Sequence, residues 1–153
     1  MTKITEFVVG FWKLNRVYFI DNNGVETDYF GKSPLGLLCY DNLGNMCAQI
    51  MKPERTLFSS ADFDGGTDKE VVEAFRGYQA YFGKYFFKNE GLIVHDIFSA
   101  IIPNWVNTQE ERFIKVINNN ELQISTPPIK IRGNEFVFMA HWIRMKAENE
   151  SFR

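Results

Sequence analysis

Short turn signals that contain glycine recur along this chain and separate strand-forming stretches of about a dozen residues. Such signals stand at residues 22–24, 42–44 and 89–91, and each begins with asparagine and ends with glycine. Turns of this kind join antiparallel strands into hairpins. About eight antiparallel strands can close into a barrel that encloses one small ligand. The sequence therefore predicts a mainly β fold, a closed up-and-down antiparallel barrel of about 8–10 strands.

One segment departs from the strand pattern and predicts the single helix of the fold. The stretch from Lys52 to Gly66 has no periodicity and is expected to be a loop. Thr67 and Glu70 then form a T-x-x-E capping box, which is typical of a helix start. Apolar residues follow at spacings of four, three and four, and Gly83 stands where a helix commonly ends. We expect a helix over about residues 67–83 that covers one end of the barrel. The apolar stripe consists of Val71, Phe75, Tyr78 and Phe82.

Length, charge and composition limit the possible partners. The 153 residues are enough for one domain over 1–153 with a core at about 8–145, and 16% of them are aromatic. The net charge of −2 includes no basic block, which argues against nucleic acid as a partner. No stretch is apolar enough to span a membrane, and the short apolar run near the start does not resemble a signal peptide. These features favour a cytoplasmic protein.

The two cysteines and the absence of catalytic signatures give no reason to expect a metal or a cofactor. If the turn at residues 42–44 has three residues, Cys39 stands opposite Cys47. In the cytoplasm such a pair is expected to be reduced. The sequence contains no nucleophile elbow, P-loop, dinucleotide fingerprint or H-E-x-x-H motif.

His95 is the strongest candidate for a polar group inside the barrel. Counting outward from the turn at residues 89–91 places Tyr85 opposite His95. His95 alternates with Ile93 and Ile97, so its side chain is expected to point inward. An imidazole there can contact a ligand or act as a general acid or base. It can equally be a hydrogen-bonded histidine of an ordinary core.

Five further residues are candidates for the ligand site, each with a structural alternative. Arg112 shares a strand face with apolar residues, so it is either buried and paired or at the cavity mouth. Tyr78 and Tyr81 lie on the expected helix, where a hydroxyl could reach a ligand, although aromatic residues at helical spacing usually serve packing. Trp105 follows a proline at a strand end and can line the entrance. Gln49 could offer an amide to the pocket unless its strand face is the outer one.

Six short segments occur in a characteristic order between about residues 8 and 144. They are Gly10-Phe11-Trp12, Pro34 to Tyr40, Tyr78 to Gly83, Pro103 to Val106, Arg112-Phe113 and Ser125 to Pro128. In this combination they resemble the bacterial and fungal lipocalin-like domain family. The resemblance implies a calycin-type barrel with an internal pocket, and some similar sequences accompany natural-product biosynthesis. It also implies that Trp12 lies at the closed end beneath Arg144, a structural pair.

Three functions are compatible with these observations. The leading hypothesis is the binding of a small, mostly hydrophobic molecule, oriented by His95, Tyr85 and Arg112. The alternative is a cavity enzyme of the isomerase, cyclase or hydrolase type that uses His95 as acid or base, with Tyr81 or Tyr85 as its partner. A third hypothesis is a structural module that forms a homodimer through outer aromatic residues. Monomer and homodimer both remain open.

Overall fold

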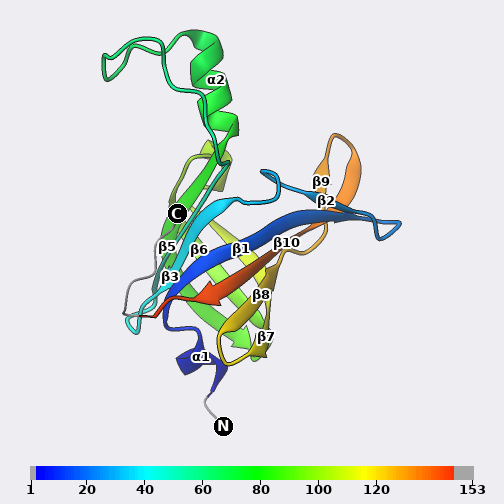
Figure 1. The fold of residues 1–153 in the computed structure, drawn as a ribbon. Helices are drawn as coiled ribbons and strands as arrows, with labels where there is room; N and C mark the ends of the chain where they lie inside the picture. Colours follow the sequence, from blue (N-terminus) through cyan, green and yellow to red (C-terminus); the bar gives the residue numbers. More distant parts are fainter. Residues whose placement is uncertain (1–2, 147–153) are drawn as a thin grey trace.

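The computed structural model describes residues 3–146, which form a closed antiparallel β-barrel with two extra strands and two α-helices (Figure 1). The predicted barrel is thus confirmed. Two short strands extend the wall beside β1 and β10, and they are β2 (Glu26–Asp28) and β9 (Ile129–Ile131). The helices are α1 (Ile4–Phe7), α2 (Asp68–Arg76) and the 3-10 helix η1 (Pro103–Trp105). The barrel strands are β1 (Gly10–Asp21), β3 (Leu35–Tyr40), β4 (Asn45–Met51), β5 (Tyr78–Asn89), β6 (Leu92–Ala100), β7 (Thr108–Asn118), β8 (Glu121–Ser125) and β10 (Asn134–Arg144).

The first and last strands close the barrel. β1 pairs antiparallel with β10, from Trp12 opposite Arg144 to Asp21 opposite Phe136, with an irregularity between Leu14 and Arg16. The other wall strands pair with their neighbours along the chain, except that β2 and β9 lie outside the ring. Within residues 3–146, closure leaves no unpaired edge in the barrel wall, so each strand presents one face inward and one outward.

The hairpin registers predicted from the turns are confirmed. Cys39 pairs with Cys47, and Tyr85 pairs with His95. The two turns differ in detail, because Gly44 has a positive φ of 81° whereas the β5–β6 hairpin closes with Asn89 opposite Leu92. An irregularity between Phe87 and Asn89 compensates for this shorter loop, so the register further along the hairpin is the expected one.

The predicted helix is too long, and its C-terminal part is a strand. The capping box is present, since Thr67 and Glu70 each accept a hydrogen bond from the other's backbone N–H. The helix nevertheless ends at Arg76, and Gly77 donates its backbone N–H to the carbonyl oxygen of Glu73. The next residues pair with β4 from Tyr78 onward, because strand pairing satisfies their backbone groups along the barrel wall.

Helix α2 does not cover the barrel end either. None of its residues is buried, and Val71 and Phe75 are each about half exposed. Figure 1 shows α2 and the loop before it projecting away from the barrel wall. The apolar spacing that suggested a covering helix thus combines an exposed helix face with the start of β5.

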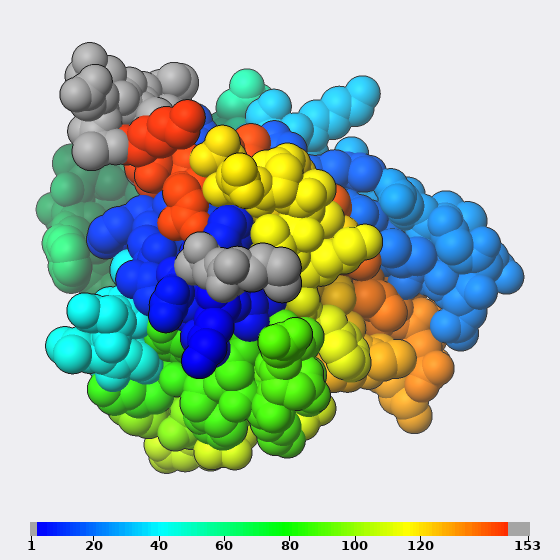
Figure 2. Space-filling model, turned by 90° about the horizontal axis from the view of Figure 1, so that it is seen from below, coloured from blue at the N-terminus to red at the C-terminus, as the bar shows by residue number. Residues whose placement is uncertain are grey.

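The N-terminal segment closes one end of the barrel. Val8 and Trp12 are fully buried, and the Trp12 indole donates a hydrogen bond to the Val8 carbonyl oxygen at 2.8 Å. The Arg144 guanidinium lies 4.2 Å from the centre of the Trp12 ring and donates to the backbone carbonyls of Phe7 and Val9. In Figure 2 the N-terminal residues, coloured blue, occupy the middle of this end and are ringed by later strands. The predicted Trp12–Arg144 pair is therefore formed.

Within residues 3–146, no helix combines the length and the apolar character needed to cross a membrane.

Candidate functional site

The barrel encloses a cavity of about 400 Å³ that is lined from every strand of the wall. Apolar side chains form most of its surface, a cluster of polar groups comes from β5, β6 and β7, and Ser125, Thr126 and Lys130 add further polar groups from the region of β8 and β9. A cavity of this size and character is typical of sites for small molecules. The apolar wall includes Leu38, Ala48, Ile50, Ile124, Ala140 and Trp142.

An aromatic cluster forms the part of the cavity remote from α1. The ring of Phe19 lies 5.1 Å from Tyr29 and 5.1 Å from Phe138, in edge-on arrangements. Tyr29 comes from the loop after β2 and also stacks on Phe30 at 4.0 Å. Edge-on aromatic packing gives this wall a defined shape.

His95 lies at the polar side of the cavity between two tyrosine hydroxyls. It comes from β6 and is 1% exposed. Its Nε2 lies 2.7 Å from the Tyr40 hydroxyl and its Nδ1 lies 3.0 Å from the Tyr81 hydroxyl. Burial lowers the pKa of His95 well below its usual value, and the positive charge of Arg112 adds to that shift. The imidazole is therefore neutral at physiological pH.

The two tyrosines beside His95 are also protonated. Burial raises the pKa of Tyr40 well above its usual value, and the nearby Tyr81 hydroxyl adds to this. Burial likewise raises the pKa of Tyr81, although the charge of Arg112 acts in the opposite direction. The three side chains thus form an uncharged hydrogen-bonded chain, whose inner end is the buried Tyr40 and whose cavity end is the partly buried Tyr81.

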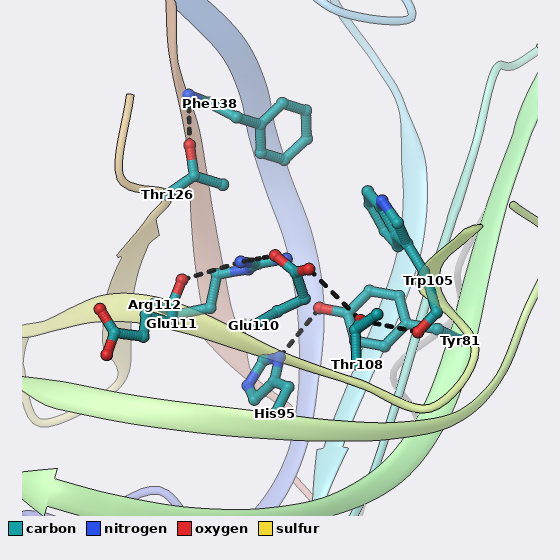
Figure 3. Close-up of polar contacts among 9 residues, drawn as sticks. All are labelled: Tyr81, His95, Trp105, Thr108, Glu110, Glu111, Arg112, Thr126 and Phe138. Carbon is teal, nitrogen blue, oxygen red and sulfur yellow. Dashed lines mark hydrogen bonds and ion pairs between the residues drawn. The ribbon is translucent and has the colours of Figure 1, made fainter. Parts of the chain in front are cut away.

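An ion pair between the buried Arg112 and the partly exposed Glu110 lies next to this chain (Figure 3). Arg112 donates from Nη1 to the Glu111 carbonyl oxygen at 2.8 Å and to the Glu110 carboxylate at 3.3 Å. The Thr108 hydroxyl lies 3.3 Å from the same carboxylate and donates to the Trp105 carbonyl at 2.7 Å. Glu110 offsets the Arg112 charge, as a guanidinium that is only 7% exposed requires. Arg112 is thus buried and paired, one of the two predicted placements.

Four of the predicted site residues come together in this cavity. His95, Tyr81, Trp105 and Arg112 all line it, and the Trp105 ring stands edge-on to Tyr81 at 5.7 Å. Tyr81 reaches the cavity from a strand rather than from a helix, so its inward direction follows from strand alternation. Whether these residues bind a ligand stays a prediction.

Three other predicted residues do not line the cavity. Tyr85 faces His95 in the register, but its hydroxyl donates to the Asp41 carbonyl at 2.7 Å and its ring packs on Tyr40. Tyr78 donates to the side-chain oxygen of Gln49 at 2.5 Å on the outer surface. Tyr78 lies on the outward face of β5, opposite to its neighbour Gln79, so the expectation that it reaches the cavity was wrong. Gln49 lies on the outward face of β4, opposite to its neighbour Ile50, which is the alternative that the sequence left open.

Sequence reasoning missed three residues that the structure places at the polar side. Gln79 lines the cavity, and its side-chain oxygen is buried without a hydrogen-bond partner among the described residues. Tyr40 is the inner partner of His95, and Glu110 is the counter-ion of Arg112. The spacing of Glu110 and Arg112, two residues apart on one strand, was a signal for their pairing. In residues 3–146 no cluster of three or more His, Cys, Asp or Glu side chains could hold a metal ion.

Comparisons with known proteins give two sequence matches and several distant structural ones. A family model described as a lipocalin-like domain matches residues 9–145. The 4'-hydroxy-3'-methoxypropiophenone carrier protein ppsC of Aspergillus oryzae (strain ATCC 42149 / RIB 40) is 30% identical over 108 residues, which cover 65% of this chain and 96% of that protein. The structure of EF1p2_mFAP2b bound to DFHBI has a TM-score of 0.49 at 11% identity, and the match covers 94% of this chain and 98% of that chain. Bovine odorant binding protein in complex with a selenium-containing odorant has a TM-score of 0.47 at 10% identity, covering 97% of this chain and 76% of its own.

Proposed function

Because the chain belongs to the lipocalin-like domain family, we propose that it binds and carries a small, mostly apolar molecule inside its barrel. The observation that supports this most directly is the cavity of about 400 Å³ inside the barrel, with its apolar wall. Removing the apolar surface of a ligand from water supplies about 25 cal/mol for each Å² buried. The apolar wall would therefore provide most of the affinity, and the polar side would orient the ligand.

The fungal relative supports a carrier role of this kind. Its name describes it as a carrier of 4'-hydroxy-3'-methoxypropiophenone, a small aromatic ketone, and this chain spans 96% of its length. A cytoplasmic location and a monomeric or homodimeric state are further parts of the proposal. Cell fractionation and analytical ultracentrifugation would test them, and a concentration-independent monomer would remove the homodimer.

Catalysis by His95 is the second candidate, because the imidazole lines the cavity and contacts two hydroxyl groups. Two features favour binding over acid–base catalysis. Both ring nitrogens of His95 are occupied by tyrosines, and burial beside Arg112 holds its pKa well below the usual value. A base with such a low pKa accepts a proton from a substrate only weakly.

Substitutions that fill the cavity with aromatic rings test the binding proposal. Ala140 is 3% exposed and points into the cavity, so Ala140→Phe places a ring there. Adding Ala48→Phe, which enters the same cavity from β4, fills more of the space. Ile143→Phe is the matched control, because Ile143 lies on β10 as well but is 41% exposed on the outer face.

The measurement is the fluorescence of N-phenyl-1-naphthylamine, an uncharged dye that becomes brighter in apolar surroundings. We expect saturable enhancement with the unaltered chain and with Ile143→Phe, weaker binding with Ala140→Phe, and the weakest with the double substitution. Circular dichroism confirms that each variant is folded. If the folded double variant binds the dye as well as the unaltered chain, the barrel cavity is not the binding site.

A further inference from the structure

We infer that the polar side of the cavity selects ligands that carry an acceptor oxygen and a separate hydroxyl group on one small apolar framework, with the acceptor at Tyr81 and the hydroxyl at Gln79. This inference rests on the proposed binding function and adds the chemical class of the ligand. It follows from the direction of the hydrogen bonds around His95 and from one buried oxygen without a partner.

The hydrogen-bonded chain at His95 has only one arrangement of protons that satisfies its buried end. A neutral imidazole has one N–H donor and one acceptor nitrogen. The Tyr40 hydroxyl is buried, and His95 Nε2 is its hydrogen-bond partner among the described residues. If Nε2 carried the proton, the Tyr40 hydrogen would be left buried without an acceptor, which is costly. Tyr40 therefore donates to Nε2, and the ring proton is on Nδ1.

This arrangement turns the Tyr81 hydroxyl into a donor for the cavity. His95 Nδ1–H donates to the Tyr81 oxygen, and the two atoms are 3.0 Å apart. The Tyr81 hydrogen then points away from His95, and Tyr81 lines the cavity. A carbonyl, ether or hydroxyl oxygen of a ligand can accept that hydrogen bond.

Gln79 offers the complementary group. Its side-chain oxygen is buried and has no hydrogen-bond partner within residues 3–146, and the residue lines the same cavity. An amide oxygen accepts hydrogen bonds, so a ligand hydroxyl or N–H can satisfy it. A buried acceptor without a partner lowers stability, and a ligand that supplies the donor removes that penalty.

The strand positions of these two residues set the length scale of the ligand. Gln79 and Tyr81 are two residues apart on the inner face of β5, which separates their Cα atoms by about 7 Å. An aromatic ring with oxygen groups at opposite ends bridges a separation of this order. Hydroxyaryl ketones have this pattern, with an acceptor at one end and a donor at the other.

Four probes separate the two polar contacts from apolar binding. They are 4'-hydroxyacetophenone, acetophenone without the hydroxyl, 4-ethylphenol without the ketone, and ethylbenzene with neither group. Isothermal titration calorimetry gives the affinity of each for the unaltered chain, for Gln79→Leu and for Tyr81→Phe. The matched controls are Gln49→Leu and Tyr78→Phe, which remove the same groups from the outer face of the barrel.

With the unaltered chain we expect 4'-hydroxyacetophenone to bind about tenfold more tightly than acetophenone and about tenfold more tightly than 4-ethylphenol. Gln79→Leu should abolish the advantage of the hydroxyl, and Tyr81→Phe should abolish the advantage of the ketone. Both variants should keep their affinity for ethylbenzene, which also shows that they are folded. The two outer-face variants should behave as the unaltered chain does.

Two results would contradict the reasoning in different ways. Equal affinity for all four probes, or the same discrimination in Gln79→Leu and Tyr81→Phe as in the unaltered chain, would overturn the inference and leave apolar binding in place. If no probe binds, including ethylbenzene, the proposed binding function itself fails.

Discussion

Replacing Tyr40 by phenylalanine tests the hydrogen-bonded chain that organises the polar side of the cavity. The substitution keeps the ring, which is 1% exposed and packs 4.7 Å from the ring of Tyr85, and removes only the hydroxyl. The loss leaves Nε2 of His95, formerly 2.7 Å from that hydroxyl, buried without a partner. Removing one member of a buried hydrogen bond costs about 1–3 kcal/mol.

We therefore expect Tyr40→Phe to lower the free energy of unfolding by about 2 kcal/mol. For a chain of this length, each kcal/mol corresponds to about 2–4 °C, so the melting temperature should fall by about 4–8 °C. Urea unfolding followed by tryptophan fluorescence measures the change, and the slope with urea concentration should stay the same. Tyr78→Phe is the control, because its hydroxyl lies on the outer surface and its loss should cost less than about 0.5 kcal/mol.

A double-mutant cycle with His95→Leu sharpens the test. If Tyr40 and His95 are bonded as described, the double variant should be more stable than the sum of the two single effects implies, by about 1 kcal/mol or more. Additive effects, or a Tyr40→Phe variant as stable as the unaltered chain, would refute the proposed hydrogen bond and with it the proton arrangement at Tyr81.

Three further predictions concern the pH dependence of stability, a close backbone contact at Gly83 and the anchoring of the N-terminal segment. Because burial lowers the pKa of His95 in the folded state, the unfolded chain binds more protons below about pH 6.5, so stability should fall with decreasing pH by up to about 1.4 kcal/mol per pH unit. Urea unfolding between pH 7 and pH 5 measures that slope, and an unchanged slope in His95→Gln would contradict this origin. Gly83→Ala should cost about 1–3 kcal/mol, because an added Cβ collides with the backbone oxygen of Asp96, whereas Gly91→Ala has room and should be nearly neutral by thermal melting. Arg144→Met should expose the N-terminal segment to faster amide hydrogen exchange, since its guanidinium binds two carbonyls there, and unchanged exchange would count against this anchoring role.

The barrel and two of its registers could be predicted because turn chemistry is local. A glycine turn fixes which residues stand opposite each other, as at Cys39 and Cys47. The end of α2 could not be predicted from the apolar spacing, because that spacing continues across Gly77 into β5. Pairing with β4 decides the structure of that segment, and this pairing depends on tertiary contacts.

The sequence could predict which side chains face the cavity only where the alternation within a single strand decides it. His95 and Arg112 each alternate with apolar neighbours, which is enough to assign an inward face. The contact between Tyr40 and His95 joins β3 to β6, which are not neighbours in the sheet, so it arises from closure of the barrel. Gln79 was missed for a related reason, because its face could be assigned only once the segment was known to be a strand.

Arg144 holds the N-terminal segment through hydrogen bonds to two of its carbonyl groups. Stability of the closed end and ligand selectivity would depend on different residues. Closure of the barrel end depends on residues at its base, where Trp12 and Val8 lie. Ligand selectivity would depend on side chains along β5 to β7. Substitutions on those strands can therefore change which small molecule is bound while the base remains intact. A scaffold divided in this way is well suited to acquiring new ligands, by natural divergence or by design.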